Sequence, residues 1–238
     1  MSLENYYKHF ELGQNGLTFS EMFNAFTENR GRFPTLFARL ADQKPLNILV
    51  LGSAAKRNID DLTSFLRVNR KNISHDEIRL LDKTAIILPE QTDPVPSSES
   101  PRIVAMKGDM NAMPLRNRSA NLVLADFTLN LNSDFRAVGR TVENISQTLE
   151  NQGLFLGSIA TGLENEAITA PNSRGYIEDP FPRTYFPLKS LQALALKAGL
   201  YPRGDQVCKP KQSSNIEVTY FLMQKLEARP KEVTVYNE

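Results

Sequence analysis

The sequence is poor in cysteine and histidine and carries almost no net charge. Cys208 is the single cysteine, and His9 and His75 are the two histidines, so we expect neither an internal disulfide nor a metal site. The 28 lysines and arginines nearly balance 27 aspartates and glutamates, which leaves a formal net charge of +1. Such a chain has no strong general attraction to nucleic acid or anionic membranes.

The sequence also lacks a long hydrophobic run. No apolar stretch approaches membrane-spanning length, and the N-terminus MSLENYYKHF does not have the basic start and apolar core of a signal peptide. The 238 residues, 41% hydrophobic and 23% charged, have the composition of a globular protein of one generous domain or two small ones. We therefore expect a soluble, cytoplasmic protein.

Residues 1–45 are predicted to form an N-terminal helical cover segment. Thr18 and Glu21 have the spacing of a capping box ahead of a group of apolar residues, and Pro34 suits the first turn of a second helix. The apolar stripes of these helices favour packing in the core, although such a segment could also lie across a sheet edge or over a cleft.

Residues 46–226 are predicted to form one α/β domain, followed by a C-terminal tail at 227–238. Short apolar runs alternate with amphipathic helices, which indicates a mostly parallel sheet with helices on both faces. One helix is expected to include Leu149 and to stop at Gly153, and the last strand, 217–224, is expected to be the edge arm of an antiparallel C-terminal hairpin. The seven expected strands are 46–51, 78–81, 103–106, 122–125, 154–159, 205–209 and 217–224.

Two segments interrupt this pattern. Residues 89–101 contain four prolines and are predicted to be an exposed loop. Residues 161–187 are long for a link between a strand and a helix and contain several aromatic residues. We expect a long loop there, which either forms a wall of the substrate site or only covers the end of the sheet.

Small and acidic residues follow the first four predicted strands. In parallel sheets ligands bind at the carboxyl ends of the strands, where the strand order reverses. A small-residue turn lets the backbone approach a ligand, and a carboxylate after the second strand can accept both hydroxyls of a ribose. A carboxylate after the third strand can accept the amine of an adenine. The strand ends therefore predict a nucleoside site at 52–54, Asp82, Asp109–Met110 and Asp126–Phe127.

The stretch 108–132 (GDMNAMPLRNRSANLVLADFTLNLN) resembles the third and fourth motifs of class I S-adenosylmethionine-dependent methyltransferases. Residues 142–159 and 186–200 are similar to later elements of that family. The resemblance implies a Rossmann-like methyltransferase fold with a mostly parallel seven-stranded sheet, S-adenosylmethionine as cofactor and S-adenosylhomocysteine as product. The cofactor-binding positions that it implies are Gly52, Ser53, Ala54, Asp82, Lys83, Asp109 and Met110, with Asp126 and Phe127 at the methyl-donor pocket.

The first glycine motif departs from the family. Val50 stands in place of an acidic residue, and Ala54 and Lys56 stand in place of the second and third glycines. A non-catalytic methyltransferase-like module that serves as a binding or structural subunit, with a protein partner, is therefore an alternative to an enzyme. The same turn also fails the Gly-x-Gly-x-x-Gly fingerprint of nicotinamide-dependent oxidoreductases.

The acceptor is expected to be a small molecule that receives the methyl group by in-line transfer. The nearly neutral charge argues against polyanions, and Asp126-Phe127 does not begin the Asn-Pro-Pro-Tyr type motif of amino-methylating DNA enzymes. Tyr7, Arg183 and Tyr185 are candidate substrate contacts. No catalytic base is assigned, since His75 precedes the second strand and is expected at the surface, while His9 reaches the site only if the N-terminal segment folds over it.

Overall fold

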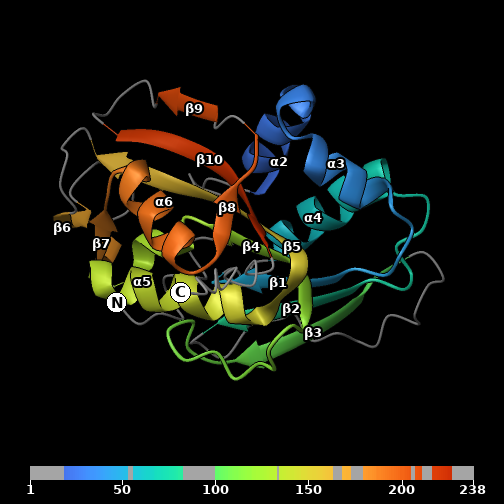
Figure 1. Cartoon of the computed structure of the whole chain (residues 1–238), viewed down its shortest axis with the longest axis horizontal. Coiled ribbons are helices and arrows are strands. Elements are labelled where there is room, and N and C mark those ends of the chain that lie inside the picture. The colour runs from blue at the N-terminus through green and yellow to red at the C-terminus, as the bar shows by residue number, and fades with distance from the viewer. Residues whose placement is uncertain are drawn as a thin grey trace, which may run out of the picture.

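A central sheet organises the structure, a computed structural model that describes residues 19–52, 56–82, 100–132, 134–162, 168–172, 179–204, 207–210 and 216–226. The main strand order is β3-β2-β1-β4-β5-β10-β8 (Figure 1). The first five strands in this order are parallel, and β10 runs antiparallel to both β5 and β8. The bounds are β1 Asn47–Leu51, β2 Glu77–Asp82, β3 Arg102–Lys107, β4 Ala120–Asp126, β5 Leu149–Gly162, β8 Leu200–Pro202 and β10 Ile216–Lys225.

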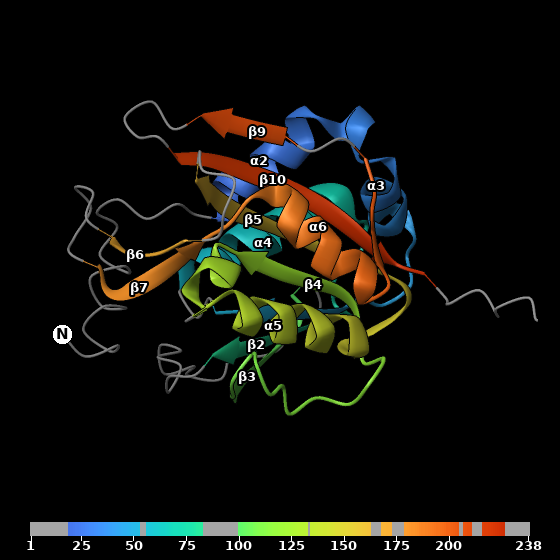
Figure 2. The same cartoon turned by 60° about the vertical axis from the view of Figure 1, so that its left-hand side comes forward.

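Helices cover both faces of this sheet, as predicted (Figures 1 and 2). Alternate residues of β1 show the division: Ile48 and Val50 belong to the core on one face, and Leu49 and Leu51 to the core on the other. The first face is covered by α2 (Phe19–Glu28), α3 (Pro34–Ala41) and α4 (Lys56–Asn69), and the second by α5 (Phe135–Thr148) and α6 (Leu188–Lys197).

The N-terminal helices pack in the core, which confirms the favoured interpretation of their apolar stripes. In α2, Phe23 is buried and stacks on Phe65 of α4 with ring centroids 4.3 Å apart. The backbone N–H of Ser20 donates to Asp61 Oδ2 of α4 at 3.1 Å, so a side chain of α4 satisfies a donor in the first turn of α2. Thr18, the expected capping residue, lies outside the described residues.

The last strand is not at the sheet edge, contrary to the prediction. β10 pairs with β5 along one side and with β8 and β9 (Val207–Pro210) along the other. Because β10 is interior, side chains on both of its faces are buried, Tyr220 on one and Phe221 on the other. This explains the weak alternation of its sequence. The three residues of β8, which complete the seven-strand path, are too few to give a periodic signal.

Leu149 was wrongly placed in a helix. α5 ends at Thr148, and Leu149 is the first residue of β5. In the β4–β5 register Ala120 pairs with Leu149 but Leu122 pairs with Leu154, so the strand bulges between these pairs. A Cβ on Gly153 would lie 2.9 Å from the carbonyl oxygen of Glu150. Gly153 is therefore required by the bulge rather than by a helix terminus.

The segment 161–187, expected to be a loop, contains strands. β6 (Ile168–Asn172) pairs antiparallel with β7 (Asp179–Tyr185) in a separate two-stranded sheet. Pro171, Pro180 and Pro182 lie within these strands, and the sequence therefore does not look like a strand. Proline is tolerated because each strand of a two-stranded sheet has one unpaired edge.

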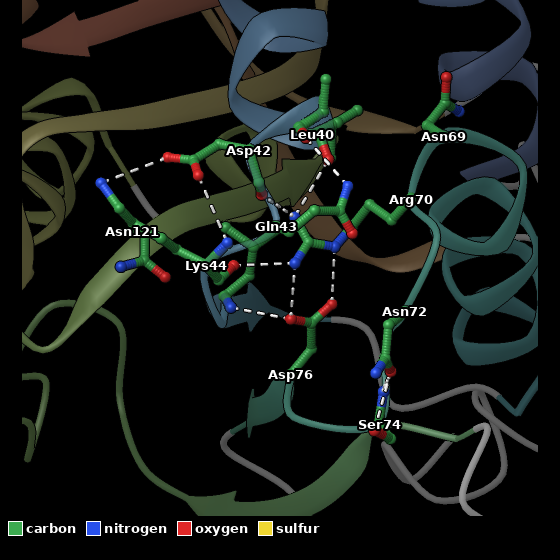
Figure 3. A network of polar contacts seen from close by, with 12 residues as sticks. Leu40, Asp42, Gln43, Lys44, Asn69, Arg70, Asn72, Ser74, Asp76 and Asn121 are labelled. Carbon is green, nitrogen blue, oxygen red and sulfur yellow. Dashed lines mark hydrogen bonds and ion pairs between the residues drawn. The ribbon is translucent and has the colours of Figure 1, made fainter.

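A buried ion pair connects several chain segments at the amino edge of the sheet (Figure 3). Arg70 Nε lies 3.0 Å from Asp76 Oδ2, and both side chains are 1% exposed. The guanidinium also donates to the carbonyl oxygens of Leu40, Asp42 and Lys44 at 2.8–3.1 Å. These contacts join the end of α3, the end of α4 and the start of β2.

Candidate functional site

The strand ends predicted to form a site meet at the carboxyl edge of the sheet. β1 lies between β2 and β4, and the chain passes from β1 to β2 on one side and later to β4 on the other. The reversal of strand order therefore falls between β1 and β4, which is where ligands bind in open α/β sheets. Gly52, Asp82 and Asp126 follow or end these three adjacent strands. The strand register brings these three strand ends side by side.

Gly52 is held in a conformation that requires glycine. Its φ is +65°, and its N–H donates to the carbonyl oxygen of Leu81 at 2.9 Å. A Cβ at this position would lie 2.6 Å from Thr128 Cγ2. Thr128 Oγ1 in turn donates to the carbonyl oxygen of Leu51 at 2.7 Å and to that of Asp126 at 3.2 Å. Thr128 thus joins the ends of β1 and β4, a role that no sequence signal indicates.

Asp82 ends β2 with a nearly buried side chain, 5% exposed. Its carbonyl oxygen accepts the N–H of Gly108 at 2.8 Å. A Cβ on Gly108 would lie 2.7 Å from Leu81 Cδ1 and 3.0 Å from Pro114 Cδ, so the chain after β3 can approach β2 closely only with glycine there. The ends of β2 and β3 are therefore in direct contact.

Asp109 and Met110 lie in a turn that is fixed to α5. Asp109 Oδ1 accepts the N–H of Asn111 at 2.8 Å, and its carbonyl oxygen accepts that of Ala112 at 2.9 Å. The carbonyl oxygen of Met110 accepts a hydrogen bond from Asn144 Nδ2 of α5 at 3.1 Å. The Asp109 carboxylate consequently has a defined orientation beside the β2 end, which suits recognition of a ligand.

Asp126 occupies the most constrained strand end. The next residue, Phe127, has a φ of +52°, and its N–H donates to both the carbonyl oxygen and Oγ of Ser158 at 3.1 Å. Ser158 lies on β5, is fully buried, and donates its hydroxyl to Asp126 Oδ1. Backbone strain that is held by several hydrogen bonds is characteristic of functional sites.

The electrostatic environment of Asp126 is unusual. In the part of the chain that the structure describes, no basic side chain forms an ion pair with it. Burial, together with a smaller contribution from the nearby Glu21 carboxylate of α2, raises the pKa of its carboxyl from 3.8 to about 7, and among the described residues the Ser158 hydroxyl acts in the opposite direction. Burial and the same two carboxylates also raise the pKa of Tyr220 on β10. Glu21 and Tyr220 are parts of this site that the sequence does not reveal.

Several other predicted site residues are not described by the structure. Tyr7, Ser53, Ala54 and Lys83 lie outside the described residues, as does His9. Arg183 and Tyr185 belong to β7, a strand in contact with β5 and with the short helix η2 (Thr128–Leu131) that follows Asp126. His75 is exposed in the turn before β2, as expected.

Two kinds of feature are absent from the described residues. No group of three or more histidine, cysteine, aspartate or glutamate side chains is arranged to hold a metal ion there. None of the helices in the described ranges has the length and apolar character needed to cross a membrane.

The comparisons with known proteins identify the fold. No known family model matches the sequence, and no curated protein matches it either. Among solved structures, a S-adenosylmethionine-dependent methyltransferase from Methanosarcina mazei is similar with a TM-score of 0.61 and 13% identity, covering 80% of this chain and 97% of that one. The fold of this chain is therefore the Rossmann-like fold of S-adenosylmethionine-dependent methyltransferases.

Two further neighbours have the same fold. One is the 1,6-didemethyltoxoflavin-N1-methyltransferase of Burkholderia thailandensis, solved with 1,6-didemethyltoxoflavin and S-adenosylhomocysteine, with a TM-score of 0.56, 14% identity, and coverage of 95% of this chain and 92% of that one. The other comes from a complex of the Haloferax volcanii Trm112 methyltransferase activator with a methyltransferase, with a TM-score of 0.57, 12% identity, and coverage of 89% and 96%.

Proposed function

We propose that this protein is an S-adenosylmethionine-dependent methyltransferase that acts on a small-molecule acceptor by in-line methyl transfer. The observation that carries the proposal is the set of acidic side chains that end β2, follow β3 and end β4 around the reversal of strand order. A ligand at this edge meets Asp82, Asp109 and Asp126 in turn. The fold that the chain shares with known methyltransferases supports the same assignment.

The residues at the strand ends fit the cofactor. Gly52 leaves no side chain at the end of β1, because a Cβ there would meet Thr128, and the backbone is accessible to a nucleoside at such a turn. Asp82 with Lys83 is assigned to the ribose side, Asp109 with Met110 to the adenine side, and the turn 52–54 to the amino-acid end. When bound, S-adenosylmethionine would supply an electrophilic methyl group on its sulfonium.

The missing acidic residue of the first glycine motif does not oppose this assignment. Val50, which stands in its place, is 1% exposed and belongs to the core shared by α2 and α4. A carboxylate there would be buried among apolar side chains. Asp126 and Phe127, on the other side of the Thr128 hydroxyl that links β1 to β4, are assigned to the methyl-donor end of the site.

A small acceptor is supported by charge and by the position of β7. The net charge of +1 gives no attraction to a polyanion. Arg183 and Tyr185 are on a strand that contacts η2, directly after Asp126, so they are proposed as substrate contacts, with Tyr7 as a third. In-line displacement depends mainly on alignment and exclusion of water, which fixed strand ends can provide.

The proposal is tested by titration calorimetry with S-adenosylhomocysteine and S-adenosylmethionine. We expect both to bind, and we expect Asp82→Ala and Asp109→Ala each to weaken binding by about tenfold, the cost of one lost hydrogen bond to the nucleoside. Asp42→Ala, a change at the amino edge of the sheet, is the matched control and should bind like the unchanged protein. Absence of binding at millimolar ligand would refute the enzyme assignment.

The alternative is a non-catalytic methyltransferase-like module. The replacements Val50, Ala54 and Lys56 in the glycine motif favour it, and one neighbour of the same fold is found in a complex with an activator protein. In that case the protein would bind neither S-adenosylmethionine nor its product, and a protein partner would be its ligand. The calorimetric result with S-adenosylhomocysteine therefore distinguishes the two functions.

A further inference from the structure

The carboxyl end of β4 carries an acidic group that the fold holds in place but does not neutralise. Asp126 receives one hydrogen bond, from the Ser158 hydroxyl to Oδ1. The groups that face it are Glu21 from α2, Tyr220 from β10 and the uncharged Ser158 from β5, while Thr128 lies two residues after it in the chain. In the described part of the chain it has no ion-pair partner, and the side chains of Lys56 and Arg57 at the start of α4 lie outside that part. An acidic group in these surroundings favours either a proton or a bound cation.

The position of Asp126 is fixed independently of any ligand. Phe127 has a left-handed backbone conformation, and its N–H donates to both the carbonyl oxygen and Oγ of Ser158. Thr128 Oγ1 donates to the carbonyl oxygen of Asp126. Three hydrogen bonds therefore anchor the backbone of Asp126 and of the two residues that follow it. A preorganised acid or base needs this kind of support, because proton transfer requires hydrogen-bond distance to the reacting atom.

We propose that Asp126 binds the ammonium form of an amine acceptor and takes one proton from it, so that the methyl acceptor is a primary or secondary amine. This inference rests on the methyltransferase function proposed above, and it names the acceptor class and the proton acceptor. The ammonium group gives one proton to the Asp126 carboxylate and becomes a neutral amine with a free electron pair. That pair forms the bond to the methyl carbon while the electrons of the carbon–sulfur bond stay on sulfur, and Asp126 later returns its proton to water.

The charge balance favours an amine over a hydroxyl acceptor. A hydroxyl brings no positive charge to the two carboxylates, and once it has given its proton to Asp126 it is an anion beside Glu21. An ammonium group is a cation and is attracted by the two carboxylates. Once one of its protons has moved to Asp126, the acceptor is a neutral amine. The carboxyl of Asp126 has a pKa of about 7, so it can both accept and release this proton near neutral pH.

The test uses an analogue of S-adenosylmethionine in which CH–NH3+ replaces the methylsulfonium group, which places an ammonium at the reacting centre. Its affinity is measured by calorimetry against that of S-adenosylhomocysteine at pH 6, 7 and 8. We expect the unchanged protein to prefer the analogue, and the preference to rise about tenfold from pH 6 to pH 8 because the ionised fraction of a group with a pKa near 7 rises by that factor.

Two variants assign this preference to the site. Asp126→Asn keeps an acceptor for the Ser158 hydroxyl but has no charge, so its preference for the analogue over S-adenosylhomocysteine should fall at least tenfold at pH 8. Glu21→Gln should lose less of the preference and move the midpoint of its pH profile to lower pH, because Glu21 raises the pKa of Asp126. Asp42→Asn, at the opposite edge of the sheet, is the control and should change neither value.

The possible failures are distinguishable. If the unchanged protein does not bind S-adenosylhomocysteine, the methyltransferase proposal itself fails. If S-adenosylhomocysteine binds but the analogue preference is absent, or is the same in Asp126→Asn, the amine assignment is overturned and the function stands. Loss of S-adenosylhomocysteine binding in a folded Asp126→Asn protein would also overturn it, since Asp126 would then hold the amino-acid end of the cofactor.

Discussion

Asp76 and Asp126 are acidic side chains at opposite edges of one sheet, and they differ in the groups that contact their carboxylates. Asp76 precedes β2, and its carboxylate meets Arg70 and also accepts the N–H of Leu46 at 2.8 Å. Asp126 ends β4 and receives a single hydroxyl hydrogen bond. Burial raises the pKa of both carboxyls. At Asp76 the Leu46 N–H and the Arg70 charge act against it, whereas at Asp126 the Ser158 hydroxyl alone does so among the described residues.

The difference separates a structural acid from the acid that we propose to act in the site. The Arg70–Asp76 pair connects three chain segments, and each hydrogen bond that it makes ends on another part of the fold (Figure 3). The Asp126 side chain contacts β5 through the hydrogen bond from Ser158, and it lies at the carboxyl edge of the sheet, where ligands bind in such folds. A carboxylate that is largely removed from water and has no cation costs stability, and proteins keep such costs where a ligand or a reaction uses the group.

The largest effect is expected from Arg70→Met. The change leaves the buried Asp76 carboxylate without its cation and leaves the carbonyl oxygens of Leu40, Asp42 and Lys44 without their shared donor. We expect the free energy of unfolding to fall by about 3–5 kcal/mol. Urea unfolding followed by circular dichroism measures it.

Arg67→Met is the matched control, because Arg67 lies in the last turn of α4, three residues before Arg70, but is exposed and bonds only to Ser100 in the described residues. It should change stability by less than about 0.5 kcal/mol. The double variant Arg70→Met with Asp76→Asn should lose less than the sum of the single variants, since the unpaired charge is removed. A loss below about 1 kcal/mol in Arg70→Met would show that the network is not the structural clamp described.

Asp126→Asn should act in the opposite direction, and only at higher pH. The folded pKa of about 7 exceeds the ordinary value of 3.8, so the folded state binds this proton more tightly than the unfolded state. The corresponding stability is fully present below pH 3.8 and is lost as the pH rises through 7, by at most about 4 kcal/mol. Between pH 5 and pH 8 the variant should therefore gain about 2 kcal/mol relative to the unchanged protein.

The measurement is the difference in free energy of unfolding between the two proteins at each pH, so that the other titrating groups cancel. Asp76→Asn is the comparison variant and should be destabilised across the same range, because Arg70 loses the charge of its partner. A pH-independent difference for Asp126→Asn would contradict a raised pKa at this position.

Much of the fold follows from the sequence because the pattern reflects local chemistry. The apolar runs of β1 and β4 and the helical spacing of α4 each appear within a few residues of chain. The errors arise where pairing with distant segments decides the structure. Leu149 continues the apolar stripe of α5 but pairs with Ala120. β6 and β7 carry prolines that only their mutual pairing explains.

The candidate site shows the same difference between what local sequence patterns predict and what distant contacts decide. The sequence locates Asp82, Asp109 and Asp126 because each follows a recognisable strand. It does not locate Glu21, which reaches Asp126 from a helix more than a hundred residues earlier, or Ser158, which is one of many serines until the β4–β5 register places it opposite Asp126. It also gives no means of telling Asp76 from Asp126, because the partners Arg70 and Ser158 become visible only in the folded chain.

The smallest predicted effect isolates the one hydrogen bond that the Asp126 side chain accepts. Ser158→Ala removes the donor to Oδ1 and an acceptor of the Phe127 N–H. The pKa of Asp126 should rise above about 7, because the hydrogen bond from Ser158 lowers it. The loss of stability should be about 1 kcal/mol at pH 6, where the carboxyl is protonated, and larger at pH 8, where the bond is to a charged acceptor. In an Asp126→Asn background the increase with pH should vanish.

Ser146→Ala removes a buried hydroxyl that donates to the neutral carbonyl oxygen of Ala198 at 2.6 Å, so its cost should not vary with pH. If the loss of stability had the same pH dependence in the two serine variants, Asp126 would be ionised throughout this range. Asp126 would then differ from Asp76 only in the number of its hydrogen-bond and ion-pair partners among the described residues.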